Sequence, residues 1–226
     1  MKKVTIILPV RNSMPWLELT VDSIKKNTKY ENFKIIFLES ESTDGTAEYC
    51  DYLSKVYSTR IKVYHEKKEG VTKMINKGIE YADKDSDILL TQDDVVFPEL
   101  LGKFCWLRRL IERADVFPNA GIVSCLNGGS VSGPTYCQDF RWVGTWCMYI
   151  KREVLDRGLR FDEQFNPGDG DDIDFTYQVT KAGFEIVYAD FCVDHHRKFS
   201  IDRHEYEDPE IRKRNGLRFK AKWGLE

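Results

Sequence analysis

The chain has 226 residues, of which 42% are apolar and 31% are charged, and its formal net charge is −3. This length predicts one domain or at most two, and so large a charged fraction excludes a membrane-embedded protein. Lysine plus arginine (34) nearly balances aspartate plus glutamate (37), so charge gives no overall case for nucleic-acid binding.

The N-terminal sequence MKKVTIILPV does not continue into a signal peptide, because its apolar run ends at Pro9 and Arg11 follows. No stretch approaches the roughly 20 apolar residues of a membrane span, so no transmembrane segment is expected.

The 6 cysteines are scattered and form no CxxC pair. This pattern predicts reduced, buried thiols and a cytoplasmic protein.

The first half of the chain alternates strand and helix patterns. Short apolar runs predict strands at Val4–Leu8, Phe33–Leu38, Ile61–Tyr64 and Asp87–Thr91. Helical patterns lie between them, at Pro15–Asn27, from the capping residues 42–44 to about Tyr57, and over Val71–Ala82. Such alternation predicts an α/β fold, with a mostly parallel central sheet flanked by helices.

The second half is less regular. Helices are expected at Leu100–Arg113, Asp171–Ala182 and after Asp208. Strands are expected at Ile122–Leu126, Val143–Ile150 and Glu185–Tyr188, and Asn127–Thr135 reads as a loop rich in glycine and serine.

Ligands of open α/β sheets bind beyond the carboxyl ends of the strands. That rule selects four polar loops, which should converge on one crevice: Pro9–Asn12, Glu39–Asp44, His65–Gly70 and Thr91–Val95.

The sharpest candidate site is Thr91-Gln92-Asp93-Asp94, which follows a buried strand. Two adjacent carboxylates at a strand end can hold a hard cation, which takes oxygen ligands and bridges to phosphates. The alternative is a helix cap or a solvated turn. A histidine pair, His195 and His196, could complete such a cation site through a neutral imidazole, although a structural use of these residues is the default.

A second candidate is an acidic cluster with no basic residue inside it: Asp162, Glu163, Asp169, Asp171, Asp172 and Asp174. The dipole of the following helix favours acids there, but six exceed what capping requires. One of them could act as a general base toward a hydroxyl nucleophile. The helix dipole lowers and the neighbouring carboxylates raise the pKa of such a base, and the sequence leaves that balance open.

A third candidate is the helix start at Gly70, where the backbone can approach a phosphate closely and Lys73 lies in the first turn. Gly78, inside the same helix, costs roughly 1 kcal/mol relative to alanine, so it is expected to serve close packing.

The order of these features resembles family 2 of the glycosyltransferases with the GT-A fold. The resemblance runs from about residue 3 to 224 and rests on the segments PVRN (9–12), ESESTDGT (39–46), GVTKMINKG (70–78), TQD (91–93), FDEQF (161–165), GDD (170–172), His195 and a helix ending KWG (222–224). Five positions depart from the family pattern. Arg11 stands where an aromatic residue is usual, Glu39 replaces the common Asp, and Glu41 replaces a Gly. Thr91 replaces the first Asp of the D-x-D motif, and Asp171 replaces the Glu of the Glu-Asp pair.

The resemblance implies one Rossmann-like GT-A domain over residues 1–226. Its first half (about 1–97) would bind a nucleotide-sugar, and its second half (about 98–226) would bind the acceptor and carry a C-terminal helix. The implied reaction is transfer of a sugar, with inversion, from a UDP-, GDP- or dTDP-sugar to a hydroxyl group of a glycan, a lipid-linked glycan, a protein or a modified nucleic acid.

Each matched motif implies a role for its residues. Asp172 would be the general base, with Asp171 beside it. Asp93 and His195 would bind Mn²⁺ or Mg²⁺, which suits oxygen ligands and one imidazole. The expected donor-binding residues are Pro9, Arg11, Asn12, Glu39, Asp44, Gly70, Lys73, Asn76, Gln92, Asp93 and Asp94.

Two other functions fit parts of this pattern. A nucleotidyltransferase of similar fold also needs acidic metal ligands, but the expected glycine-rich basic loop after the first strand is missing. A catalytically silent nucleotide-sugar-binding module would fit the incomplete D-x-D motif, but the retained Asp172 argues against it.

The C-terminal helix is basic. No acid lies between residues 212 and 222, a stretch that contains six basic residues: Arg212, Lys213, Arg214, Arg218, Lys220 and Lys222. It could contact an anionic membrane surface peripherally or bind a nucleic acid, and the alternative is a solvated helix face.

Overall fold

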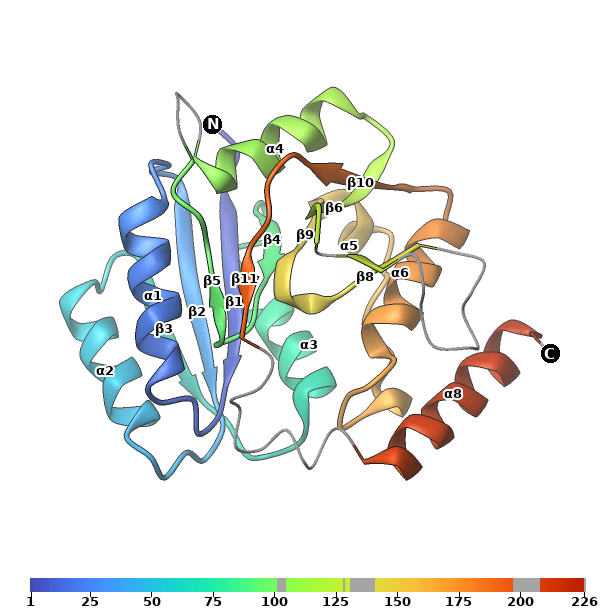
Figure 1. The fold of residues 1–226 in the computed structure, drawn as a ribbon, viewed down its shortest axis with the longest axis horizontal. Helices are drawn as coiled ribbons and strands as arrows, with labels where there is room; N and C mark the ends of the chain where they lie inside the picture. The colour runs from blue at the N-terminus through green and yellow to red at the C-terminus, as the bar shows by residue number, and fades with distance from the viewer. Residues whose placement is uncertain (101–104, 128, 131–140, 197–207, 226) are drawn as a thin grey trace.

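Seven strands form one sheet in the computed structural model, which describes residues 1–100, 105–127, 129–130, 141–196 and 208–225. The order across the sheet is β10 (Glu185–Ala189), β6 (Ala120–Cys125), β9 (Met148–Ile150), β4 (Asp87–Leu90), β1 (Val4–Val10), β2 (Phe33–Glu39) and β3 (Ile61–His65) (Figure 1). Only β9 runs antiparallel to its neighbours within this sheet, β4 and β6. The predicted α/β class with a mostly parallel sheet is therefore confirmed.

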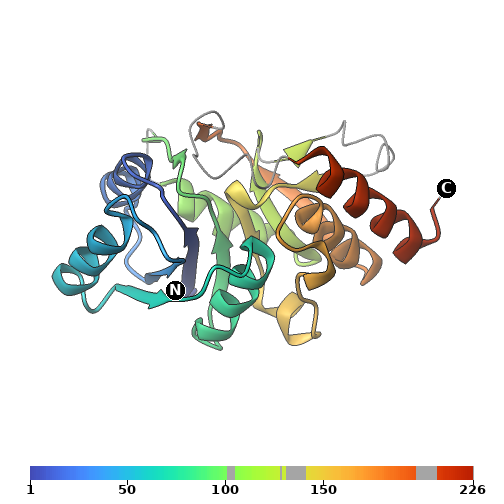
Figure 2. The same ribbon diagram turned by 90° about the horizontal axis from the view of Figure 1, so that it is seen from below.

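Helices cover both faces of the sheet (Figure 2). On one face the core includes residues of α1 (Trp16–Asn27), α2 (Thr46–Val56) and α4 (Trp106–Val116). On the other it includes residues of α3 (Val71–Tyr81), α5 (Arg152–Asp156) and α6 (Asp171–Lys181). Successive strand residues point to opposite faces, so Ile6 and Leu8 join the first core and Ile7 the second.

Small elements surround the carboxyl end of the sheet. β5 (Val95–Val96) pairs antiparallel with β11 (Asp194–His195), and β7 (Gly129–Ser130) pairs with β8 (Trp142–Val143). The 3₁₀ turns η1 (Thr145–Cys147) and η2 (Glu163–Phe165) precede β9 and α6. The C-terminal helix α8 (Pro209–Trp223) lies beside α6 in both views (Figures 1 and 2).

Gly78 lets α3 pack directly on β1. A Cβ atom at this position would lie 2.5 Å from Cγ2 of the buried Ile7, closer than two carbon atoms can approach. The expectation that this glycine serves close packing is confirmed.

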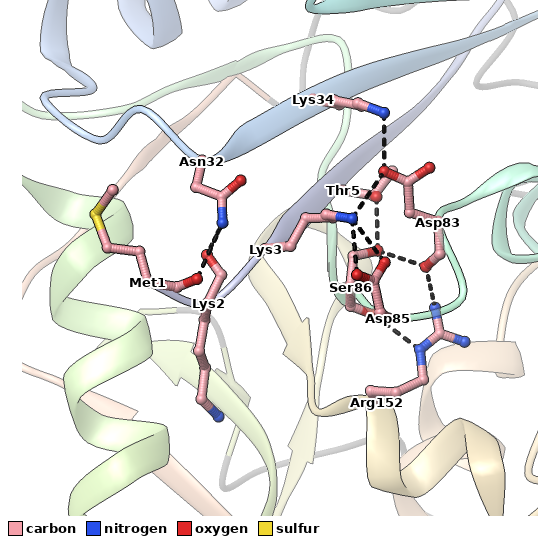
Figure 3. A network of polar contacts seen from close by, with 10 residues as sticks. All are labelled: Met1, Lys2, Lys3, Thr5, Asn32, Lys34, Asp83, Asp85, Ser86 and Arg152. Atoms are coloured by element: carbon pink, nitrogen blue, oxygen red, sulfur yellow. Dashed lines mark hydrogen bonds and ion pairs between the residues drawn. The ribbon is translucent and has the colours of Figure 1, made fainter.

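The amino ends of β1 and β4 are tied together by polar side chains (Figure 3). Thr5 and Ser86 share a buried hydrogen bond of 2.7 Å between their hydroxyl oxygens. Lys3 contacts Asp83 and Asp85, and Arg152 donates to the carbonyl oxygens of Asp83 and Ser86. This network holds the amino ends of these two strands, at the end of the sheet opposite the loops predicted to bind a ligand.

Two predicted elements differ from the structure. The strand expected over Val143–Ile150 is broken into β8, η1 and β9. At the break the indole of Trp146 lies over Gly144, where a Cβ atom would overlap the ring. The helix expected from Leu100 is found as α4 from Trp106, and residues 101–104 lie outside the described residues. Part of the predicted loop, 131–135, also lies outside them.

Free cysteines at positions 50, 105, 125 and 147 are buried as expected, but Cys192 is exposed; Cys137 lies outside the described residues. Within the described ranges, no helix combines the length and apolar character that crossing a membrane requires.

Candidate functional site

The loops that follow β1, β2, β3 and β4 meet at the carboxyl end of the sheet. Parallel pairing sets Val10 beside Glu39 and Glu39 beside His65. Ser13, after β1, donates a hydrogen bond to a carboxylate oxygen of Asp93, after β4. Residues from four separate segments are thus brought to one place.

Asn12 and Asp44 brace the first two loops against each other. The Asn12 backbone N–H donates to Ser42 Oγ at 3.1 Å, and the Thr43 N–H donates back to Asn12 Oδ1 at 2.8 Å. Asp44 accepts from the Met14 N–H at 2.9 Å. Burial would raise the pKa of Asp44, but its hydrogen bonds, chiefly those from Thr46 and Met14, outweigh it and hold the pKa below the ordinary value. Both side chains therefore hold the loops after β1 and β2 together.

Glu39 is a buried carboxylate, only 3% exposed, at the end of β2. Its Oε1 accepts from the Ser42 N–H at 2.7 Å, and its Oε2 lies 2.8 Å from His65 Nδ1. The other imidazole nitrogen of His65 lies 3.0 Å from an oxygen of Asp51. Hydrogen bonding to Glu39 and then to Asp51 raises the pKa of His65. The sequence placed His65 at the start of the polar loop His65–Gly70 but predicted no contact or function for its side chain.

Side chains of the segment after β4 anchor it on both sides. Thr91 Oγ1 donates to the Trp146 carbonyl at 3.0 Å, and Gln92 Nε2 donates to Thr145 Oγ1 at 3.1 Å. The Asp93 carbonyl accepts from Thr20 Oγ1 at 2.8 Å. These contacts hold the backbone that carries Asp93 and Asp94 in place at the strand end.

His195 lies next to Asp94, although the two residues are 101 positions apart in the sequence. The antiparallel pair of β11 and β5 sets His195 opposite Val95, and His195 Nε2 lies 3.3 Å from Asp94 Oδ1. The Asp94 side chain is buried and that of His195 is 10% exposed, and the imidazole stacks on Trp146 with 5.0 Å between ring centroids. Within the described ranges, His195 Nε2 makes no hydrogen bond.

A divalent cation would fit this pair, since an imidazole nitrogen and a carboxylate oxygen at this separation can both face one ion. Among the described residues, no group of three or more His, Cys, Asp or Glu side chains is arranged to hold a metal. A cation here would therefore take its remaining ligands from water or from a bound phosphate.

Asp171 and Asp172 begin α6. Asp171 is buried and accepts from Thr72 Oγ1 of α3 at 3.3 Å, and burial raises its pKa to about 6. Asp172 is half-buried and accepts from the Ile173 N–H at 2.8 Å. Burial, then the charge of Asp171, raises the pKa of Asp172 well above its ordinary value. Burial thus outweighs the helix dipole, which the sequence could not show.

Other expected donor-binding residues contact the protein itself. Gly70 has φ 90°, and a Cβ there would lie 2.3 Å from Asn166 Oδ1. Asn76 exchanges hydrogen bonds of 2.8 and 3.2 Å with the backbone of Phe161. Lys73 lies 3.6 Å from Glu69. The contacts of Gly70 and Asn76 join α3 to the segment before α6, whereas that of Lys73 stays at the start of α3.

The remaining two residues lie at the end of β1. Pro9 pairs with Leu38 in the sheet, and the Arg11 N–H donates to Ser13 Oγ at 3.1 Å.

A separate cavity of about 490 Å³ lies between α3, η2 and α6. Among the described residues that line it, Asn76 is the one that was expected to bind the donor.

Comparison with known sequences gives a family. The sequence model of glycosyl transferase family 2 matches residues 5–136. An uncharacterized glycosyltransferase of Rickettsia bellii is 27% identical over 143 residues, which cover 59% of this chain and 20% of that protein. The chain thus spans about a fifth of that relative's length.

Solved structures share the fold. The mannosyltransferase PcManGT from Pyrobaculum calidifontis, in complex with GDP-Man and Mn²⁺, superposes with a TM-score of 0.69 at 20% identity, covering 97% of this chain and 63% of that chain. TarS 1–349 of S. aureus in complex with UDP gives a TM-score of 0.62 at 16% identity, covering 84% of this chain and 59% of that one. At these identities the likeness shows the fold alone.

Proposed function

The chain belongs to glycosyl transferase family 2, and from that premise we propose that it transfers a sugar, with inversion, from a nucleoside-diphosphate donor to an acceptor hydroxyl. The observation that carries this proposal is the close approach of His195 Nε2 to Asp94 Oδ1, 3.3 Å apart, in the segment after β4 that also contains Asp93. Ligands of open α/β sheets bind beyond the carboxyl ends of such strands.

The donor is proposed to bind to the half formed by residues 1–97. PcManGT was solved with GDP-Man and TarS 1–349 with UDP, which supports a nucleotide-sugar without choosing among UDP, GDP and dTDP. Glu39 and Arg11 would flank the base. The acceptor would bind to residues 98–226, which contain the acidic pair of α6.

The proposed cation, Mn²⁺ or Mg²⁺, would bind to His195 and to the carboxylates of the segment after β4. In the structure His195 lies against Asp94, whereas the Asp93 carboxylate contacts Ser13. Mn²⁺ in the PcManGT complex supports a divalent cation in this fold. A bound cation supplies positive charge that neutralises the departing diphosphate. Ser13 and Trp146, which contact Asp93 and His195, would keep these two ligands oriented.

Asp172 is the proposed general base. In the reaction the acceptor oxygen bonds to the anomeric carbon, the bond from that carbon to the diphosphate oxygen breaks, and Asp172 takes the acceptor's proton. Its raised pKa supports this role, because the affinity of a base for a proton grows with its pKa. Asp171, hydrogen-bonded to Thr72, would remain beside it as the second acid.

The proposed location is the cytoplasm, which the buried free cysteines support. Peripheral membrane contact through α8 stays a proposal. Four of its basic residues, Arg212, Arg214, Arg218 and Lys222, contact the segment 162–174, so an anionic surface would compete with these contacts. Salt-sensitive sedimentation with anionic vesicles would support that contact, and its absence would remove it.

The test of function incubates the chain with UDP-, GDP- and dTDP-sugars and a panel of hydroxyl acceptors, with Mn²⁺ or Mg²⁺, and measures the nucleotide released. Release of a nucleoside diphosphate is expected for one donor. Release of pyrophosphate would indicate a nucleotidyltransferase. Binding of a nucleotide-sugar without any release would indicate a silent binding module, and both results would contradict the proposal.

A further inference from the structure

The loop before α6 is held by a buried side chain from the far end of the chain. Asn215 of α8 is completely buried. Its Nδ2 donates to three backbone carbonyls, those of Phe165, Gly168 and Asp169, at 3.0, 2.8 and 2.8 Å. One amide thus spans the whole turn that leads into Asp171 and Asp172.

That turn has a backbone that needs outside support. Gly168, Asp169 and Gly170 have φ values of 151°, 67° and 96°, all positive. Glycine adopts such values freely, but for Asp169 they carry a conformational cost. The Asn215 amide satisfies the carbonyls that this conformation leaves without sheet or helix partners, and so it favours the turn.

A charge contact reinforces the same turn. Arg212 Nε lies 2.9 Å from Asp169 Oδ2, and the Arg212 side chain is otherwise 57% exposed. The Asp169 carboxylate is two residues from Asp171 and repels any negative charge there. Arg212 offsets that repulsion by supplying a positive charge next to Asp169.

The end of α8 fixes the next turn of α6. Asp174 is completely buried, and it accepts from Lys222 Nζ and Trp223 Nε1, both at 2.8 Å. Phe219 packs beside these contacts in a small apolar cluster with Phe165 and Ile173. Asp174 is therefore used in holding the helices together, and the acids left for chemistry are Asp171 and Asp172.

We propose that α8 is a clamp that positions the general base: Arg212 and Asn215 are positioning residues that hold the turn 168–170, and through it Asp172, in the orientation that accepts the acceptor's proton. This inference rests on the proposed function of Asp172. It goes beyond that function because it gives a role in the reaction to Arg212 and Asn215, which lie 40 and 43 positions after Asp172 in the sequence.

The clamp makes a prediction that a purely structural helix does not. If α8 only stabilises the fold, its variants lower the melting temperature but leave the turnover of the folded protein unchanged. If it positions Asp172, its variants lower kcat while nucleotide binding stays intact, because the loops after β1, β2 and β4 are held by hydrogen bonds among their own residues.

The experiment measures kcat and KM for transfer, the affinity for the nucleoside diphosphate, and the melting temperature. The variants are Arg212→Ala and Asn215→Ala, with Leu217→Ala, an exposed position on the same helix, and Lys55→Ala, an exposed cation on α2, as controls. A misplaced catalytic group costs on the order of 10²-fold, so we expect about a 10- to 100-fold lower kcat for both clamp variants. We also expect an unchanged nucleotide affinity, and controls that behave as the wild type.

Arg212→Lys keeps the positive charge and should recover most of the lost turnover. Arg212 is largely exposed, so Arg212→Ala should fold even if Asn215→Ala does not. Unchanged kcat in folded Arg212→Ala, or no recovery in Arg212→Lys, would overturn the inference. A wild type that transfers no sugar would instead contradict the proposed function, so the two failures are distinguishable.

Discussion

The strand-end loops and the turn before α6 both carry candidate reactive groups, but they are held in different ways. Glu39 ends β2, and Asp93 and Asp94 lie in the segment after β4. Both strands pair with β1, and hydrogen bonds to nearby side chains hold the segment after β4. Asp171 and Asp172 follow a turn that depends on Asn215, far along the chain. The comparison teaches that the donor side of this fold is set by its sheet and by contacts near it, whereas the proposed base depends on a remote helix.

The largest expected effect is on the side that depends on α8. Asp172→Asn keeps the shape and removes the base, and loss of a general base costs roughly 10²–10⁴-fold in rate. Nucleotide affinity should be preserved, because Asp172 would face the acceptor. Single-turnover transfer rates check this, with Asp171→Asn as the matched variant, which should be milder. A nearly active Asp172→Asn beside an inactive Asp171→Asn would assign the base to Asp171.

The second prediction concerns the cation site on the sheet side. Asp93→Ala should abolish cation-dependent nucleotide binding, and His195→Ala should weaken it less, because an imidazole is one ligand among several. Asp94→Ala is included because Asp94 Oδ1 lies 3.3 Å from His195 Nε2. Calorimetric titration with nucleoside diphosphates and Mn²⁺ measures all three. Wild-type activity that resists a chelator would contradict a metal site.

The third prediction separates binding from folding at Glu39. Glu39→Ala should weaken nucleotide binding, and calorimetry checks this. The carboxylate is buried and hydrogen-bonded to Ser42 and His65, so its removal should also cost about 1–3 kcal/mol of stability. Glu39→Gln keeps most of the shape and serves as the control. Unchanged affinity for every nucleotide in both variants would remove Glu39 from the site.

The smallest effect expected is a pH dependence of stability from His65. Its contacts with Glu39 and Asp51 raise the pKa above the ordinary 6.5, so the protonated form is favoured by folding. The stabilisation should be complete below pH 6.5 and be lost as pH rises through the raised pKa. Because His65 is half-exposed, it should amount to less than about 1 kcal/mol. Urea unfolding of wild type and His65→Gln across this range measures it, and a constant difference would contradict it.

The strands near the centre of the sheet were predictable because they are buried on both faces. Such strands read as continuous apolar runs, as Val4–Leu8 and Ile88–Leu90 do. The region around Gly144 was not predictable in the same way, because its residues are uncharged and suit a strand. The tertiary structure places the Trp146 ring over Gly144, where a side chain would have no room, and the 3₁₀ turn η1 lies there.

The sequence by itself determined the alternating pattern, the polar residues at the strand ends and the acids at the start of α6, because strand burial and turn chemistry are local properties. The tertiary structure alone decided which of them meet. The pairing of β11 with β5 brings His195 to Asp94, and the fold turns Asn76 toward Phe161 and Asn215 toward the turn before α6. It also decided the pKa of Asp172, because burial depends on segments that pack together from distant parts of the chain.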